Sequence, residues 1–236
     1  MIRLSSRIRR LASVSAGIVV LSGCATQRAE GPVVAPDRHI AVRPGRAGFV
    51  VAAPHGTSDI YTADIAGEIA RRTGFGLVVG RQREPSTDPE PTEAARRVDA
   101  LYEQRVREAA QGPLRFYAEI HGNNRTTCAG QIEIATVGVD RELALRLRSL
   151  AELIRDAHLR ASREIQRLDV LIEPVDRVTY RVSGATRDGI LGVTERRLHI
   201  ELPQCARRDW RDAYTAILSD FLAQAVMLTA GRSAVP

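Results

Sequence analysis

His55 and Asp59 follow a run of apolar residues, Phe49–Ala53, in the sequence FVVAAPHGTSD. Imidazole and carboxylate groups are preferred zinc ligands, and functional loops of α/β sheets lie at the carboxyl ends of strands. The His-x-x-x-Asp spacing spans one helical turn if a helix begins after Pro54, which would let both side chains converge on one ion. A second role is open for Asp59, as the N-cap of a helix that begins at Ile60.

A second histidine, His121, ends a predicted strand over Leu114–Ile120. Together with His55 and Asp59 it makes a set of two imidazoles and one carboxylate, which leaves an open position on a catalytic zinc ion and lowers the pKa of its water. The sequence therefore predicts one zinc ion held by these three residues. Glu119 shares the strand face of His121. It has three open roles: a third ligand, a partner that orients a histidine, or a buried charge paired with an arginine.

Glu201 lies within the otherwise apolar segment Leu198–Leu202, LHIEL. An unpaired charge is costly in such a strand. We therefore predict that Glu201 is the general base of a metal hydrolase, which takes a proton from water and passes it to the leaving amine. The alternative is a glutamate that faces solvent from an edge strand. His199 shares the strand face of Glu201 and has three open roles: a further ligand, a neighbour of the site or a packing residue.

Three polar residues, Asn123, Asn124 and Arg125, follow His121 directly. An amide and a guanidinium on one loop could hold a substrate carboxylate, although Asn-Asn is also a common turn sequence. Nucleophilic hydrolysis by serine has less support, because the sequence has no Gly-x-Ser-x-Gly segment.

Strands and helices alternate along the chain, which predicts an α/β fold with a mainly parallel sheet that admits antiparallel members. A polar loop, Arg81–Pro91, is long enough to line a site. The predicted strands are Phe49–Ala53, Leu77–Val79, Leu114–Ile120, Gln131–Val137, Val170–Glu173 and Leu198–Leu202, and the predicted helices are Ile60–Thr73, Thr92–Ala110, Asp140–Arg163 and Asp209–Leu228.

The first 24 residues are predicted to be an export signal. Four arginines precede a short apolar run, Leu11–Leu21, which is too short to span a bilayer. The run ends in Leu-Ser-Gly-Cys, which resembles a bacterial lipobox with Cys24 as the lipidated residue. An ordinary signal peptide with a chance cysteine is the alternative. We expect residues 25–48, rich in Pro, Gly, Arg and Ala, to be a flexible tether, and residues 49–236 to be a single domain.

Removal of this segment changes the charge of the chain. It leaves 30 basic and 28 acidic residues, so the net charge falls from +6 to about +2. Nucleic-acid binding therefore has little support. We expect a protein anchored by lipid on the extracytoplasmic or periplasmic side of a bacterial cell envelope.

Two cysteines remain if Cys24 carries lipid. An oxidising compartment favours a disulfide between Cys128 and Cys205. Because Cys128 follows His121 and Cys205 follows Glu201, such a bond would tie two site loops together. Two free buried thiols are the alternative.

Three segments in this order, APHGTSD, AEIHGNNR and LHIELP, resemble the N-formylglutamate amidohydrolase-like family, which is related to zinc carboxypeptidases. The resemblance covers residues 49–228 and implies a three-layer α/β/α sandwich with a mixed sheet. It implies that His55, Asp59 and His121 match the zinc ligands and that Glu201 matches the catalytic carboxylate.

We therefore expect a zinc-dependent hydrolase that cleaves an amide or peptide bond in an N-acyl amino acid or a small peptide with a free carboxylate. Two alternatives are a zinc peptidase or amidase directed at peptidoglycan and a non-catalytic, ligand-binding lipoprotein.

Overall fold

The computed structural model describes residues 40–80, 93–123, 128, 130–179 and 194–230 of the chain. All of them belong to one compact unit, Asp37–Pro236. The predicted signal peptide with Cys24 and the predicted loop Arg81–Pro91 lie outside the described residues.

Seven strands form one mixed sheet in the order β1-β3-β2-β4-β7-β5-β6. Four neighbouring pairs are parallel, β2–β3, β2–β4, β4–β7 and β5–β6, and two are antiparallel, β1–β3 and β5–β7. The strands are β1 (Ile40–Arg43), β2 (Arg46–Ala53), β3 (Phe75–Gly80), β4 (Phe116–Gly122), β5 (Gln131–Val137), β6 (Asp169–Ile172) and β7 (Arg196–Leu202). The predicted α/β fold with a mixed, mainly parallel sheet is confirmed.

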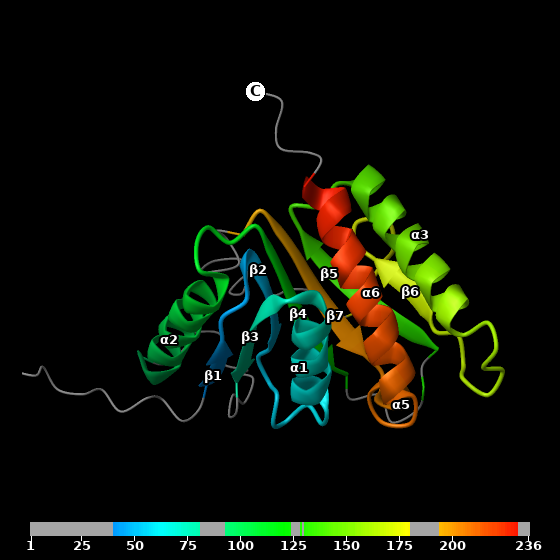
Figure 1. Cartoon of the computed structure of the whole chain (residues 1–236), viewed down its shortest axis with the longest axis horizontal. Coiled ribbons are helices and arrows are strands. Elements are labelled where there is room, and N and C mark those ends of the chain that lie inside the picture. Colours follow the sequence, from blue (N-terminus) through cyan, green and yellow to red (C-terminus); the bar gives the residue numbers. More distant parts are fainter. Residues whose placement is uncertain (1–39, 81–92, 124–127, 129, 180–193, 231–236) are drawn as a thin grey trace, which may run out of the picture. The chain divides into compact units, whose positions relative to one another are not determined.

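Helices cover both faces of this sheet, which gives three layers (Figure 1). One face carries α1 (Thr62–Thr73), α3 (Arg141–His158) and α6 (Arg211–Ala230), and the short helix α5 (Gln204–Arg207) leads from β7 into α6. The opposite face carries α2 (Glu93–Ala110), which packs over β1, β2 and β3. Among the described residues, no helix combines the length and the apolar character needed to cross a membrane.

Alternation along the strands divides the core into two parts. Val51 and Ala53 of β2 belong to the larger core beneath α1, α3 and α6, whereas Val50 and Ala52 pack against α2. On β4, Ala118 lies in the larger core and Tyr117 faces α2. Because neighbouring side chains on a strand point to opposite faces, the odd-numbered residues of β4 lie on the α2 side of the sheet. The same alternation holds for β7, whose even-numbered leucines and isoleucine fill the larger core.

The predicted tether extends too far into the domain. Residues 40–43 form β1, which pairs antiparallel with β3, and β2 already begins at Arg46. Ile40 and Val42 pack against the core beneath α2. Pairing with β3 and this apolar contact stabilise a strand of only four residues. The Pro and Gly beside it led the sequence pattern to predict a linker there.

Candidate metal centre

Four side chains with acid–base or ligand chemistry lie on the neighbouring parallel strands β4 and β7. In the sheet register, Glu119 pairs with His199 and His121 pairs with Glu201. Alternation places all four on the α2 side of the sheet. Glu119 is 5% exposed, and His121 and Glu201 are each 7% exposed. Charges buried this deeply need partners, and these residues partner mostly one another.

His55 and Asp59 come to the same place from the end of β2. The backbone N–H of Asp59 donates to the carbonyl of His55 at 2.8 Å, which closes a turn. The ring of His55 lies 5.2 Å from the ring of His121, measured between centroids. Oδ2 of Asp59 accepts a hydrogen bond from the N–H of Gly122 at 3.1 Å and lies 3.9 Å from Nδ1 of His121. The structure thus brings the three predicted zinc ligands together.

The carboxylate of Asp59 does not cap α1. The helix begins at Thr62 with Tyr61 at its N-cap, and no side chain caps it. Only the backbone carbonyl of Asp59 takes part, accepting a hydrogen bond from the Thr62 hydroxyl at 2.8 Å. The side chain is therefore left to face Gly122 and His121.

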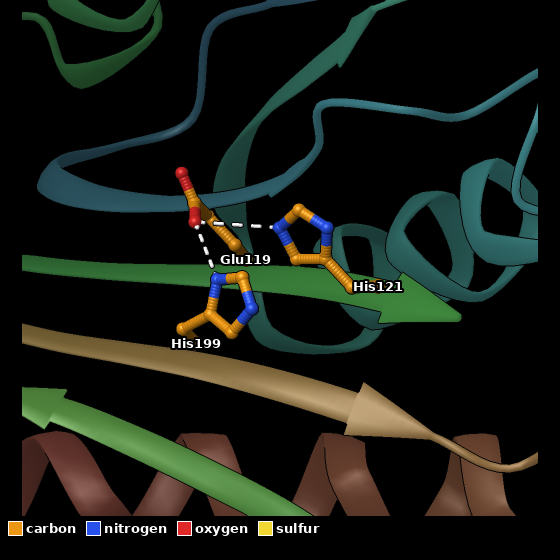
Figure 2. Close-up of side chains that lie close together, drawn as sticks. All are labelled: Glu119, His121 and His199. Atoms are coloured by element: carbon orange, nitrogen blue, oxygen red, sulfur yellow. Dashed lines mark hydrogen bonds and ion pairs between the residues drawn. The ribbon is translucent and has the colours of Figure 1, made fainter. Parts of the chain in front are cut away.

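The two ring nitrogens of His121 face different groups. Nε2 lies 3.4 Å from Oε2 of Glu119 (Figure 2), whereas Nδ1 faces Asp59. Burial, and then the positive charge of His199, lower the pKa of His121 below its ordinary value. The ring is then neutral at pH 7. With its proton on Nε2 towards Glu119, the lone pair of Nδ1 points towards Asp59.

Glu119 is an ionised carboxylate with three partners on one oxygen. Oε2 accepts from Nη2 of Arg197 at 2.7 Å and from Nδ1 of His199 at 3.1 Å, in addition to its contact with His121. Burial acts to raise the pKa of Glu119, but the charge of Arg197 and the hydrogen bonds from the two histidines outweigh it and hold the pKa well below its usual range. Glu119 thus combines two of its three predicted roles: it is paired with an arginine and it orients histidines.

His199 lies between the two carboxylates. Its Nδ1 contacts Glu119, and its Nε2 lies 3.0 Å from Oε1 of Glu201. Burial acts to lower the pKa of His199, but the hydrogen bonds to Glu119 and Glu201 outweigh it and raise the pKa to about 9. Among the described residues, no group donates to the other oxygen of Glu201, Oε2, although that atom is buried.

One group of side chains in this region has the spacing of a metal site, and the three predicted zinc ligands form a second, looser group. Ligand atoms of Glu119, His121 and His199 all lie within 4.8 Å of one another. The second group is His55, Asp59 and His121. Ligands of one tetrahedral zinc ion lie about 3.3–3.5 Å apart. Oδ2 of Asp59 and Nδ1 of His121, 3.9 Å apart, lie near that spacing, and the ring centroid of His55 lies 5.2 Å from that of His121. The described residues therefore contain the donors that a metal ion requires.

Arg207 connects the three chain segments that carry these donors. Its guanidinium is buried and donates to the carbonyls of Leu202 at 3.3 Å, Ile60 at 2.9 Å and Asn123 at 3.1 Å. These carbonyls belong to the end of β7, the segment after Asp59 and the segment after β4. Burial lowers the pKa of Arg207 from its ordinary, very high value, which leaves the side chain charged.

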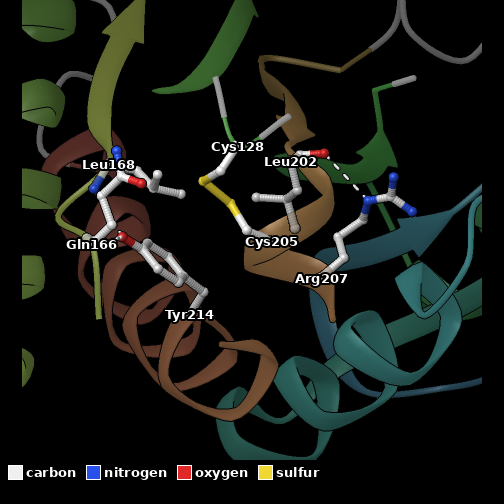
Figure 3. The surroundings of a disulfide bond; sticks show 7 residues. All are labelled: Cys128, Gln166, Leu168, Leu202, Cys205, Arg207 and Tyr214. Atoms are coloured by element: carbon white, nitrogen blue, oxygen red, sulfur yellow. Dashed lines mark hydrogen bonds between the residues drawn. A yellow bond between two sulfur atoms is a disulfide. The ribbon is translucent and has the colours of Figure 1, made fainter. Parts of the chain in front are cut away.

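A disulfide joins Cys128 to Cys205 (Figure 3), with a Cα–Cα distance of 5.4 Å. The predicted bond is confirmed. It joins the connection between β4 and β5 to α5, two residues before Arg207, which bonds Leu202 in the same view. The covalent link and the guanidinium thus fix neighbouring segments that follow β4 and β7.

Of the predicted substrate-binding residues, only Asn123 lies among the described residues, whereas Asn124 and Arg125 lie outside them. Asn123 is 3% exposed, and its backbone N–H donates to the carbonyl of Leu202 at 3.1 Å. Its backbone therefore takes part in joining β4 to β7.

The sequence analysis left the role of His199 open and assigned no role to Arg197 or Arg207. Arg197 and His199 alternate with apolar residues on the strand that carries Glu201, a pattern that places them on its face. That pattern could have indicated them, since three polar residues on one side of a buried strand require a common set of partners. Arg207 bonds only backbone carbonyls in the contacts described above, and no sequence pattern indicates such partners.

Comparison with known proteins gives similarity only at the level of structure. No family model and no curated protein matches the sequence. Among solved structures, a bacteriophage poly-gamma-glutamate hydrolase is 14% identical over 82% of this chain and 90% of its own, with a TM-score of 0.47. A succinylglutamate desuccinalase from Vibrio parahaemolyticus is 12% identical over 79% of this chain and 72% of its own, with a TM-score of 0.44.

A metallo-carboxypeptidase from Burkholderia cenocepacia is 12% identical, with a TM-score of 0.38, over 81% of this chain and 58% of its own. Likenesses this distant do not identify an activity. The resemblance to N-formylglutamate amidohydrolases stays a prediction, and the function has to be argued from the site itself.

Proposed function

We propose that this protein is a zinc-dependent hydrolase of an amide or peptide bond, with His55, Asp59 and His121 as metal ligands and Glu201 as general base. The observation that carries the proposal is the state of the Glu201 carboxylate. One oxygen is bonded to His199, and the other is buried without a donor among the described residues, next to His121 in the sheet register. An unsatisfied buried carboxylate oxygen is costly, and a water molecule or a substrate group would satisfy it.

The set of His55, Asp59 and His121 fits a metal ion better than the set of Glu119, His121 and His199. Oε2 of Glu119 already accepts a hydrogen bond from the guanidinium of Arg197, and a cation at this oxygen would be repelled by that charge. His199 has both ring nitrogens directed at carboxylates. A ring that donates from both nitrogens has no lone pair to offer a metal.

Glu119 then has the role of orienting His121. A histidine that binds a metal through one nitrogen commonly donates from the other to a carboxylate. The 3.4 Å contact between Nε2 of His121 and Glu119 fits this arrangement and directs Nδ1 towards Asp59.

A zinc ion bound here would lower the pKa of its water towards neutrality. Glu201 would accept a proton on Oε2 while His199 holds Oε1, and Glu201 would then transfer that proton to the leaving amine. Burial of the carboxylate keeps bulk water away from it and strengthens its electrostatic interactions.

The proposed substrates are N-acyl amino acids or small peptides with a free carboxylate. The motif resemblance supports this class, and the guanidinium of Arg125, four residues after His121 in the sequence, is of a kind that binds carboxylates. Peptidoglycan-derived peptides are the alternative substrates with the same chemistry. We also propose that Cys24 anchors the protein in a bacterial cell envelope. The disulfide supports this location, because such bonds persist in oxidising compartments.

The proposal is tested with wild-type protein and Glu201→Gln, both loaded with zinc. Metal content is measured by mass spectrometry, and hydrolysis is measured on N-formyl-L-glutamate, on dipeptides and on a muropeptide. We expect one zinc ion in both proteins and a fall in kcat of about 10³-fold or more in the variant. Loss of zinc in Glu201→Gln would make Glu201 a ligand instead. A wild-type protein that holds no zinc and hydrolyses none of these bonds would refute the enzyme proposal.

Glu68→Gln is the matched control. It makes the same change of charge at a glutamate that pairs with Arg71 and Arg72 on the outer surface of α1. It should keep both the zinc and the activity.

A further inference from the structure

Glu201, the general base of the proposed reaction, has His199 as a hydrogen-bond partner. Oε1 of Glu201 lies 3.0 Å from Nε2 of His199. No donor to Oε2 exists among the described residues. The hydrogen bond from His199 therefore decides which carboxylate oxygen is occupied and which one is left to react.

Besides its contact with Glu201, His199 is held by two further contacts. Its Nδ1 lies 3.1 Å from Oε2 of Glu119, the residue opposite it in the sheet register. Its ring stacks on the ring of His121, with centroids 4.1 Å apart and planes inclined by 28°. Glu119 is fixed in turn by Arg197, whose side chain is fully buried. The ring of His199 thus has little freedom to turn.

This arrangement makes a hydrogen-bonded row from Arg197 through Glu119 and His199 to Glu201, part of which is drawn in Figure 2. In this row, the atom that contacts the carboxylate of Glu201 is Nε2 of His199. A glutamate side chain has three rotatable bonds, and a carboxylate held at one oxygen keeps a smaller range of positions.

We propose that His199 is the positioning residue of the general base: its Nε2–H holds Oε1 of Glu201 and thereby presents Oε2 to the reacting groups. This inference rests on the proposed hydrolase function. It goes further in assigning a specific role to a specific nitrogen, which two amide substitutions can separate.

The amide nitrogen of glutamine lies close to the place of a histidine Nε2, and that of asparagine lies close to the place of Nδ1. His199→Gln therefore keeps the donor to Glu201, and His199→Asn keeps only the donor to Glu119. We expect His199→Gln to stay within about fivefold of the wild-type kcat and His199→Asn to lose about 10²-fold. KM should change by less than about twofold in both variants, because the base does not bind the substrate in its ground state.

Zinc content and melting temperature are measured for both variants, and both should hold zinc. If His199 only stabilised the fold, the fall in kcat of each variant would follow the fall in its melting temperature. Equal kcat values for the two variants, or a wild-type kcat in His199→Asn, would overturn the proposal.

A second readout does not depend on activity. Crystal structures of the two zinc-loaded variants should show the Glu201 carboxylate in its wild-type position in His199→Gln and displaced in His199→Asn. If the wild-type protein hydrolyses none of the test substrates, the proposed function fails, and these structures still decide the positioning role. A carboxylate that stays in place in His199→Asn would refute it.

Discussion

Substitution of Gly122 by alanine is predicted to displace the guanidinium of Arg207 and so to destabilise the segments that carry the site residues. A Cβ atom at this position would lie 2.6 Å from both Nε and Nη1 of Arg207. Carbon and nitrogen atoms in van der Waals contact lie about 3.4 Å or more apart, so the guanidinium would have to move by about 0.8 Å. Gly122 does not have a positive φ, so the backbone itself accepts alanine.

The loss of stability caused by Gly122→Ala follows from the contacts of Arg207. Its guanidinium donates to three backbone carbonyls at 2.9–3.3 Å, and a shift of about 0.8 Å would break one or two of these bonds. Hydrogen bonds from a charged group contribute about 1.5–3 kcal/mol each to stability. Replacing glycine by alanine also reduces the conformational entropy of the unfolded chain, which stabilises the folded variant by about 0.5–1 kcal/mol. We expect Gly122→Ala to lower the free energy of unfolding by about 2–4 kcal/mol.

A double-mutant cycle with Arg207→Ala tests the reasoning. The four metal-free proteins are unfolded in urea, and their free energies of unfolding are compared. With the guanidinium removed, the added methyl group has space, and Gly122→Ala should cost less than about 1 kcal/mol. An equal cost of Gly122→Ala with and without Arg207, or no cost in the wild-type background, would refute the reasoning.

Three further predictions concern the stability of the fold. The disulfide closes a sequence separation of 77 residues, so Cys128→Ser with Cys205→Ser should lower the free energy of unfolding in urea by up to about 4.5 kcal/mol; an unchanged value would contradict a stabilising role. Asp140→Ala removes the hydrogen bond to the N–H of Leu143 that caps α3 at 2.8 Å, and should cost about 1 kcal/mol in the same assay; no loss would show that the cap is dispensable. The pKa of His199 is raised from 6.5 to about 9 in the folded protein. In metal-free protein, protonated His199 should therefore contribute about 3 kcal/mol to the free energy of unfolding, fully below pH 6.5 and less and less as the pH rises through 9. The stability difference between wild type and His199→Gln should fall over this range, and a difference independent of pH would contradict the raised pKa.

The fold was predictable because its strands carry clear apolar runs separated by amphipathic helices. Parallel strands place their carboxyl ends at one edge of the sheet, and this rule was enough to expect His55 and His121 in one place. The start of the domain was missed. β1 has four residues and lies next to Pro44 and Gly45, and it is stabilised by pairing with β3 and by apolar contacts beneath α2.

The partners within the site were less predictable, because they depend on which strands are neighbours. Glu119 meets His199 only because β4 and β7 are adjacent and in this register. A chain separation of 80 residues gives no sign of that contact. The carbonyl partners of Arg207 come from three separate segments and carry no side-chain signal.

The central claim is the identity of the metal ligands. The most direct test is anomalous diffraction at the zinc absorption edge from crystals of the zinc-loaded protein. We predict a single peak bounded by the ring of His55, the carboxylate of Asp59 and Nδ1 of His121, with Glu201 close by and outside the coordination sphere. A peak held by Glu119 and His199, or the absence of zinc from this region, would contradict the account.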